Sequence, residues 1–239
     1  MNFEPTNIKG IFFDLDDTLY DYAHSNTIGK QASFAYLSSK VNRTKEDVET
    51  YFNAARDEIK QTLEQELGFE SAQSHSRLLY FLRTIELMTD KTNSTIALEC
   101  EKIFWDNFIN NITPFPNMID FIKKIKSLGK KIVIVTDMTA RVQLEKLIKL
   151  KIDTLIDLMV SSEESGREKP HPASLLLGLK KCKLHPREVV MIGENEKRDI
   201  AAASTIGILP IAFRNKPTQP QVLYAKNFKQ LLNWFDCQD

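Results

Sequence analysis

Four short runs of almost unbroken apolar residues constrain the fold of this 239-residue chain more than any other feature. They span residues 8–16, 130–137, 188–195 and 207–214, and residues 155–163 form a fifth candidate. A strand that is apolar on both faces is typical of a parallel sheet with helices packed on each side. These runs therefore predict a buried, mainly parallel β-sheet.

Helical patterns separate the runs in the second half of the chain. Four segments carry apolar residues at three- and four-residue spacing: MIDFIKKIKSLG, TARVQLEKLIKLKI, HPASLLLGLKKCKL and RDIAAASTIG. Gly129 and Gly207 close the first and the last of them. Strand and helix thus alternate from about residue 115 onward, which indicates right-handed βαβ units. The predicted fold class is α/β, with a doubly wound, mainly parallel sheet of the Rossmann-like type.

The region between the first two runs interrupts this alternation. It contains amphipathic helical stretches, such as residues 76–88 and 97–112, but no convincing strand. A βαβ crossover needs far fewer than the roughly ninety residues found here. We therefore predict two domains, with residues 1–20 and 113–239 forming the sheet core and residues 21–112 forming an inserted helical domain.

The charge balance excludes some classes of partner. Lys plus Arg and Asp plus Glu each count 32, so there is no net charge to attract nucleic acid or a membrane surface. The sequence contains neither a G-x-G-x-x-G nor a G-x-x-x-x-G-K-[ST] motif, so no Gly-rich nucleotide cradle is expected. The amino terminus has no signal-peptide pattern, and no apolar run is long enough to span a membrane. We expect a cytoplasmic protein, either a monomer or a homodimer.

Three acids follow the first apolar run within four positions. Asp14 and Asp16 are two residues apart, so they point the same way in an extended chain. Neighbouring carboxylates repel each other unless a cation or a shared proton relieves them. Asp14, Asp16 and Asp17 are therefore either solvated loop and helix-capping acids or part of a cation site.

The ends of the other runs favour a functional site. The second run ends in Thr136 and Asp137, and the third is followed by Gly193, Glu194 and Asp199. Between these two runs a lysine precedes a proline in SGREKPHP, at a predicted helix start. Because ligands bind beyond the carboxyl ends of parallel strands, we expect these side chains to converge. The lysine that precedes the proline in SGREKPHP is Lys169.

This ordered set resembles the four motifs of the haloacid dehalogenase-like hydrolase superfamily. The motifs are D-x-D-x-T at Asp14, a strand ending in Thr136, Lys169 before a proline, and Gly193-Glu194 followed by Asp199. The insertion after the first motif is similar to the family's C1 cap. The fourth motif departs from the family pattern because Glu194 stands where the family usually has Asp.

The resemblance implies a set of catalytic and substrate-binding roles. Asp14 would be the nucleophile that forms an aspartyl-phosphate, and Asp16 the general acid and base. Lys169 would place a positive charge beside the phosphoryl oxygens. Thr136 and the N–H of Asp137 would form a hydrogen-bonding cup for the phosphate.

The resemblance also implies a Mg²⁺ site. Its ligands would be carboxylates of Asp14, Glu194 and Asp199 and the backbone carbonyl of Asp16, with Asp199 binding directly or through water. We predict that Glu194 still binds the metal, although its side chain is one methylene longer than that of Asp.

These features favour a Mg²⁺-dependent phosphatase that hydrolyses a small phosphate monoester. Its substrate would be a small phosphorylated metabolite: a phosphosugar, a sugar-acid phosphate, a nucleotide or a flavin nucleotide. The alternatives are a phosphosugar mutase, a 2-haloacid dehalogenase and a non-catalytic relative that binds a phosphorylated ligand. Asp16 argues against the dehalogenase, which needs no acid at that position. His75 and Arg77 are candidate specificity residues of the insertion.

Overall fold

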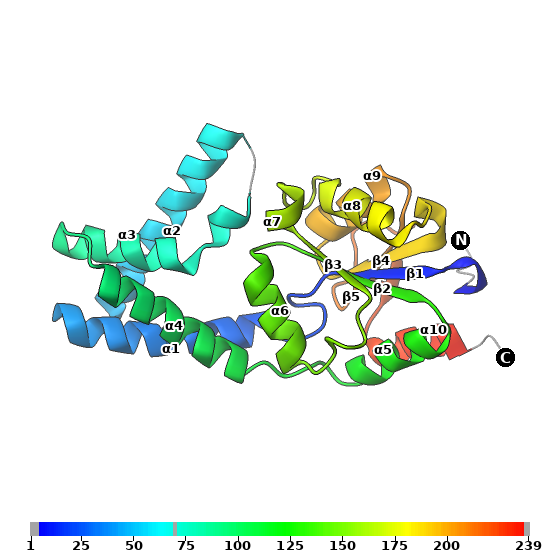
Figure 1. The fold of residues 1–239 in the computed structure, drawn as a ribbon, viewed down its shortest axis with the longest axis horizontal. Helices are drawn as coiled ribbons and strands as arrows, with labels where there is room; N and C mark the ends of the chain where they lie inside the picture. Colours follow the sequence, from blue (N-terminus) through cyan, green and yellow to red (C-terminus); the bar gives the residue numbers. More distant parts are fainter. Residues whose placement is uncertain (1–4, 69–70, 237–239) are drawn as a thin grey trace. The chain divides into compact units, whose positions relative to one another are not determined.

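The computed structural model describes residues 5–68 and 71–236. Its contacts divide the chain into two compact units. The first, here called the sheet unit, comprises Met1–Asp21 and Thr113–Asp239, and the second, the helical unit, comprises Tyr22–Ile112. Figure 1 draws the elements of both units along the chain.

The sheet unit is built on a six-stranded sheet in which every neighbouring pair is parallel. Its strands are β1 Gly10–Phe13, β2 Lys131–Thr136, β3 Leu158–Ser161, β4 Val189–Gly193, β5 Leu209–Phe213 and β6 Leu223–Ala225. The strand order is β3-β2-β1-β4-β5-β6. This topology confirms the predicted doubly wound α/β class.

The register places the ends of the central strands at the same level. Phe13, the last residue of β1, pairs with Ile134 of β2 and with Ile192 of β4. The next residue stays close to the sheet, because the Asp14 N–H donates to the Ile192 carbonyl at 3.0 Å. The loops that follow β1, β2 and β4 therefore begin at one edge of the sheet.

Two strands differ from the prediction. The first run was expected to extend to residue 16, but β1 ends at Phe13 because the chain turns there, and Asp17 adopts a positive φ of 59°. The short strand β6 was not predicted, because its three residues, LYA, form no extended apolar run. The fifth candidate, residues 155–163, contains β3 and then ends in a helix at Ser162.

Helices cover both faces of the sheet, as the apolar strands require. They are α5 Met118–Ser127, α6 Ala140–Lys149, α7 Ser162–Ser165, α8 Ala173–Cys182, α9 Ala201–Thr205 and α10 Phe228–Asp236. Figure 1 shows α5 and α10 on one face of the sheet and α8 and α9 on the other. The predicted helix over RDIAAASTIG begins instead as a π-helical turn, Glu196–Ile200, which leads into α9.

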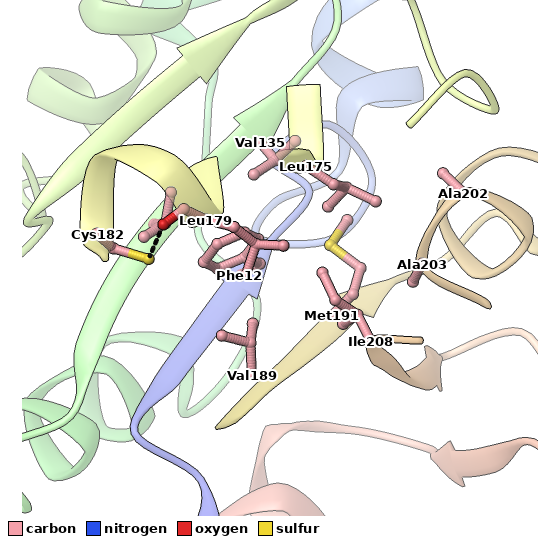
Figure 2. Close-up of a cluster of buried hydrophobic side chains, with 11 residues drawn as sticks. Phe12, Val135, Leu175, Leu179, Cys182, Val189, Met191, Ala202, Ala203 and Ile208 are labelled. Carbon is pink, nitrogen blue, oxygen red and sulfur yellow. Dashed lines mark hydrogen bonds between the residues drawn. The ribbon is translucent and has the colours of Figure 1, made fainter. Parts of the chain in front are cut away.

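One layer of the core lies between the strands and α8 and α9 (Figure 2). Phe12 of β1 and Met191 of β4 are fully buried there and pack with Leu175 and Leu179 of α8. A Cβ atom on Gly178 would lie 2.9 Å from the Phe12 ring, so only glycine allows α8 to approach β1 this closely. Tight apolar packing on this face fixes the strands whose ends carry the polar loops.

The helical unit contains four long helices. They are α1 Tyr22–Val41, α2 Lys45–Leu67, α3 Arg77–Thr89 and α4 Ser94–Asn110. Local signals in the sequence start three of them: Thr44 and Asp47 form a capping box for α2, and Ser76 and Asn93 cap α3 and α4. The four helices are joined by a chain of aromatic contacts from Phe34 of α1 through Phe52 of α2 and Phe81 of α3 to Phe104 of α4.

The two segments that connect the sheet unit to the helical unit pair with each other inside the sheet unit. Tyr20 forms an isolated antiparallel bridge with Pro114. Next to it, the Phe115 N–H donates to the Leu19 carbonyl at 3.0 Å. The chain therefore leaves and re-enters the sheet unit through adjacent segments.

None of the described helices combines the length and the hydrophobicity that crossing a bilayer requires.

Candidate active site

Asp14 and Asp16 lie in the loop directly after β1, at the carboxyl edge of the sheet. Asp14 is only 7% exposed, and the intervening Leu15 is fully buried. The loop is fixed at Asp17, whose left-handed backbone is held by a hydrogen bond from Arg214 Nη1 to its carbonyl at 3.1 Å. The turn thus fixes the backbone beside the two acids.

Lys169 is the central cation of this edge. Its ammonium is 2.6 Å from Asp14 Oδ1, 2.7 Å from Asp199 Oδ1 and 3.1 Å from the Val135 carbonyl, so each of its three protons has an acceptor. Burial alone lowers the pKa of Lys169, but nearby carboxylates, led by Asp14 and Asp199, raise it well above its ordinary value. Lys169 therefore carries a permanent positive charge, and its ion pairs link Asp14, in the loop after β1, to Asp199, which follows β4.

Asp14, Glu194 and Asp199 form a cluster of three carboxylates. They offer oxygen atoms that all lie within 4.8 Å of one another. Burial raises the pKa of Asp14 and of Asp199, and the Lys169 charge opposes both shifts. Three carboxylates face one ammonium, so the ionised cluster has an excess of negative charge. Hard oxygen ligands with excess negative charge suit a divalent cation such as Mg²⁺.

Gly193 is required by this cluster. A Cβ atom at that position would lie 2.4 Å from Asp199 Oδ2, far closer than atoms can approach. The Asp199 carboxylate instead accepts a hydrogen bond from the Asn195 N–H at 3.0 Å. The glycine at the end of β4 therefore leaves the space that Asp199 fills.

Glu194 reaches the cluster despite its longer side chain. The Thr18 hydroxyl lies 2.9 Å from Glu194 Oε2 and 3.1 Å from Asp14 Oδ2, and its single proton serves one carboxylate at a time. Burial, with the Asp14 and Asp199 charges adding to it, raises the pKa of Glu194 to about 9. In the metal-free protein Glu194 therefore holds a proton at neutral pH.

The Asp16 carboxylate has partners that the sequence did not reveal. Lys146 Nζ lies 2.7 Å and 2.8 Å from its two oxygens, and the Tyr20 hydroxyl donates to Oδ1 at 2.5 Å. The Lys146 side chain is 0% exposed. Asp16 is thus held in one orientation by a buried lysine and a tyrosine.

The loop after β2 is organised by Gln143, which was also missed. Its Nε2 donates to the Thr136 hydroxyl oxygen and to the Asp137 carbonyl, both at 2.6 Å, and lies 3.4 Å from Asp16 Oδ2. Thr136 is almost completely buried. Gln143 therefore connects the loop that carries Asp16 with the loop that carries Thr136.

Asp137 faces a second ionic network. Its carboxylate accepts from the Lys169 N–H at 3.1 Å and from Arg198 Nη2 at 3.0 Å, while Arg198 also lies 2.6 Å from Glu168. Burial raises the pKa of Asp137, and the Lys169 charge opposes that shift. The sequence-based prediction used only the N–H of Asp137, whereas its side chain joins the loops after β2 and β4.

One local prediction was wrong. Lys169 was expected at the start of a helix, but it lies in a turn and α8 begins at Ala173. The cis peptide bond between Lys169 and Pro170 is part of that turn.

The sequence pattern that could have identified Gln143 and Lys146 lies on the buried face of α6. Gln143 and Lys146 alternate there with Val142 and Leu147 in the spacing of one helix face. Two long polar residues among the apolar positions of an amphipathic helix indicate a buried polar partner.

Comparisons with known proteins agree with this geometry. Residues 11–213 match the family described as haloacid dehalogenase-like hydrolase. The chain belongs to this family.

Curated relatives and a solved structure cover most of the chain. It is 31% identical over 204 residues to ribulose-1,5-bisphosphate 5-phosphatase of Halopiger xanaduensis, covering 85% of this chain and 83% of the relative. It is 28% identical over 205 residues to glyceraldehyde 3-phosphate phosphatase of Methanocaldococcus jannaschii, covering 85% and 84%. The structure of a 2-haloacid dehalogenase from Pseudomonas syringae superposes with a TM-score of 0.76 at 20% identity, covering 97% and 100%. That likeness concerns the fold.

These matches confirm the predicted family and the predicted enzyme class, a hydrolase of the phosphatase type.

Proposed function

We propose that this protein is a Mg²⁺-dependent phosphatase that hydrolyses a small phosphate monoester through an aspartyl-phosphate on Asp14. One observation carries the proposal: Asp14 shares Lys169 with Asp199, lies in the carboxylate cluster with Glu194, and is followed two residues later by Asp16. A nucleophile, a cation that compensates its charge and a proton-transfer group thus lie together at one edge of the sheet.

In the first step Asp14 attacks the phosphorus atom, and the bond between phosphorus and the ester oxygen breaks. Asp16 donates a proton to the departing oxygen, so that the product leaves as an alcohol. Lys169, held beside Asp14 at 2.6 Å, compensates negative charge on the phosphoryl group as it transfers.

In the second step a water molecule attacks the phosphorus of the aspartyl-phosphate. Asp16 accepts the proton of that water, the bond between phosphorus and Asp14 breaks, and inorganic phosphate is released. Asp14 and protonated Asp16 are then regenerated. Lys146 and Tyr20 position Asp16 for both transfers.

The cluster of Asp14, Glu194 and Asp199 fits a Mg²⁺ ion, and the Asp16 carbonyl is the fourth proposed ligand. When bound there, the ion would offset the charge of the phosphate and of the acid cluster. Thr136 and the Asp137 N–H are proposed to orient the phosphate.

Several considerations support a small phosphorylated metabolite as substrate. The relatives above are named for phosphorylated sugars of three and five carbons, as the words glyceraldehyde and ribulose state. A 2-haloacid dehalogenase shares the fold, but dehalogenation needs no acid two residues after the nucleophile, where this chain has Asp16.

The direct test is a screen of phosphate monoesters with Mg²⁺, repeated with a chelator, in which released phosphate is measured. We expect turnover that depends on Mg²⁺ and products that are the free alcohol and inorganic phosphate. Transfer of phosphate to a second sugar would instead indicate a mutase. Absence of turnover with every ester would favour a non-catalytic binding protein.

Lys146→Met is expected to lower kcat about 10- to 100-fold with a much smaller change in KM. The substitution removes the ammonium that fixes the Asp16 carboxylate, so proton transfer suffers more than substrate binding. Steady-state kinetics would measure this, with Lys149→Met on the next turn of α6 as the control. An unchanged kcat in Lys146→Met would remove Lys146 from the mechanism, and a partial recovery in Lys146→Arg would support its role.

The metal-free protein is expected to lose stability as the pH rises from about 5 to about 9. The folded state keeps a proton on Glu194, whose pKa is raised to about 9, while the unfolded state releases it near 4.5. The folded state therefore binds more protons in this window, and rising pH favours unfolding. Thermal denaturation in chelator would show a Tm that falls with pH in the wild type and falls less in Glu194→Gln. Glu145→Gln, which alters a glutamate paired with Arg141, is the control.

Mg²⁺ affinity is expected to rise with pH in the same window, by up to about tenfold per pH unit, because the ion must displace the Glu194 proton. Calorimetry in two buffers of different ionisation enthalpy would detect the released proton. Glu194→Ala should weaken Mg²⁺ binding and Mg²⁺-dependent turnover, and Glu194→Asp should retain them. Unchanged metal dependence in Glu194→Ala would exclude Glu194 from the metal site.

A further inference from the structure

Arg198 pairs with two carboxylates that lie beside the proposed site. Its Nη2 atom is 3.0 Å from Asp137 Oδ2 and 2.6 Å from Glu168 Oε2. Along the chain, each of these three residues directly adjoins a residue to which a role in the reaction has been given above. The adjoining residues of Asp137, Glu168 and Arg198 are Thr136, Lys169 and Asp199, in that order. Two ion pairs of one guanidinium therefore connect three segments of the sheet unit beside the proposed phosphate position.

The three side chains of this network are largely shielded from water. The Glu168 side chain is 0% exposed, and those of Asp137 and Arg198 are 17% and 26% exposed. Charges in such surroundings are screened much less by salt than charges on the surface. Because two carboxylates share one guanidinium, removal of that guanidinium would leave two buried negative charges without this counter-ion.

The Asp137 carboxylate lies where the proposed reaction needs positive charge. Its Oδ1 accepts from the Lys169 N–H at 3.1 Å, and the N–H of Asp137 is proposed to orient the phosphate. Its charge also reaches the nucleophile: burial is the main cause that raises the pKa of Asp14, and the charges of Asp16 and Asp137 add to it. Without compensation, the Asp137 charge would repel a phosphate dianion and weaken its attraction to Lys169.

We propose that Arg198 is a positioning residue for phosphate binding, because it compensates the charges of Asp137 and Glu168. With those charges compensated, the Lys169 ammonium attracts the phosphate at full strength. The proposal rests on the phosphate position of the proposed function. Arg198 acts through the two carboxylates rather than through contact with the phosphate.

Arg198→Met should raise the Kd of inorganic phosphate, the proposed product, at least about tenfold, because two uncompensated carboxylates then act on the anion. The measurement is a calorimetric titration of phosphate into the protein in Mg²⁺. In turnover, the same substitution should raise KM more than it lowers kcat, since it weakens binding of the phosphate and leaves the proton-transfer group in place. This pattern is the opposite of that expected for Lys146→Met.

Asp137→Asn distinguishes charge compensation from a purely structural role. This substitution and Arg198→Met break the same ion pair, so a structural role predicts weaker phosphate binding in both. Charge compensation predicts that the Kd falls or stays at the wild-type value in Asp137→Asn, whose amide oxygen can still accept from the Lys169 N–H. The double variant Arg198→Met/Asp137→Asn has the same net charge as the wild type and should regain most of the lost affinity.

Two further variants secure this test. Arg198→Lys keeps the positive charge and loses only the planar guanidinium, so it should fold and should weaken phosphate binding less than Arg198→Met does. Lys126→Met is the matched control, because Lys126 forms a partly exposed ion pair with Asp157 at 2.7 Å, directly before β3 and thus at the amino edge of the sheet. The phosphate Kd should be unchanged in this control.

Phosphate binding and ester turnover together separate this proposal from the proposed function. Phosphate binding that depends on Arg198 in a protein that hydrolyses no ester would support the role of Arg198 and reject the phosphatase. Ester turnover with an unchanged phosphate Kd in Arg198→Met, or with weaker phosphate binding in Asp137→Asn, would retain the phosphatase and overturn the role of Arg198. A wild type that binds no phosphate would also overturn it.

Discussion

Asp14→Asn is expected to reduce phosphate release by about three orders of magnitude or more. An amide does not attack phosphorus, and no other carboxylate occupies the position next to Lys169 Nζ that Asp14 Oδ1 holds at 2.6 Å. The fold should persist, because asparagine has almost the same size and Lys169 keeps its ion pair with Asp199. The measurements are steady-state turnover and the trapping of labelled phosphate on the protein.

Asp17→Asn is the matched control for this variant. Asp17 is in the same loop, but its role is conformational: its φ is 59°, which asparagine tolerates as well as aspartate does. Turnover near that of the wild type is therefore expected. Near-normal turnover in Asp14→Asn, or labelled phosphate that remains bound to that variant, would show that Asp14 is not the nucleophile.

Lys169→Met is expected to damage both catalysis and stability. It removes the ammonium that lies between Asp14 and Asp199 and leaves two buried carboxylates without their shared counter-ion. Breaking a buried ion pair from one side costs about 3–5 kcal/mol, and for a chain of this size each kcal/mol lowers Tm by about 2–4 °C. Turnover should fall about 100- to 1,000-fold, because charge on the transferring phosphate is no longer compensated.

Lys130→Met is the control that separates the loss of stability from the loss of catalysis. Lys130 is also a buried lysine of the sheet unit, and its ammonium donates to the Ile8 carbonyl at 2.6 Å, away from the carboxylate cluster. This control should lower Tm and leave kcat unchanged. In Lys169→Met, Mg²⁺ should restore part of the lost stability, because a divalent ion compensates the same carboxylates. A Lys169→Met protein with normal turnover would refute the role of Lys169.

The central strands were predictable because a buried strand appears in the sequence as a continuous run of apolar residues. Strands such as β2 and β4 are covered on both faces, so the positions between their ends are apolar and the run is visible in the sequence. β6 has only three residues at the edge of the sheet and leaves no such trace. The exact end of β1 also escaped prediction, because the turn at Asp17 continues directly from the apolar run.

The candidate site was only partly predictable. Thr136 ends its strand, and Asp14, Asp16 and Glu194 come just after theirs, so the parallel topology alone predicted that they would share an edge. Lys146 and Gln143 come from a helix face, and their contact with Asp16 depends on how α6 packs against the strands. The Arg198 network joins residues 137, 168 and 198 and likewise arises only from tertiary packing.

The bridge between Tyr20 and Pro114 has an evolutionary consequence. Because the entering and leaving segments are already paired, the sheet order does not depend on what lies between them. Recombination could therefore replace the whole segment between these two residues with another insertion and leave the strand-end chemistry in place. The inserted helical unit and the strand-end site can then diversify at different rates in descendants of one ancestral gene.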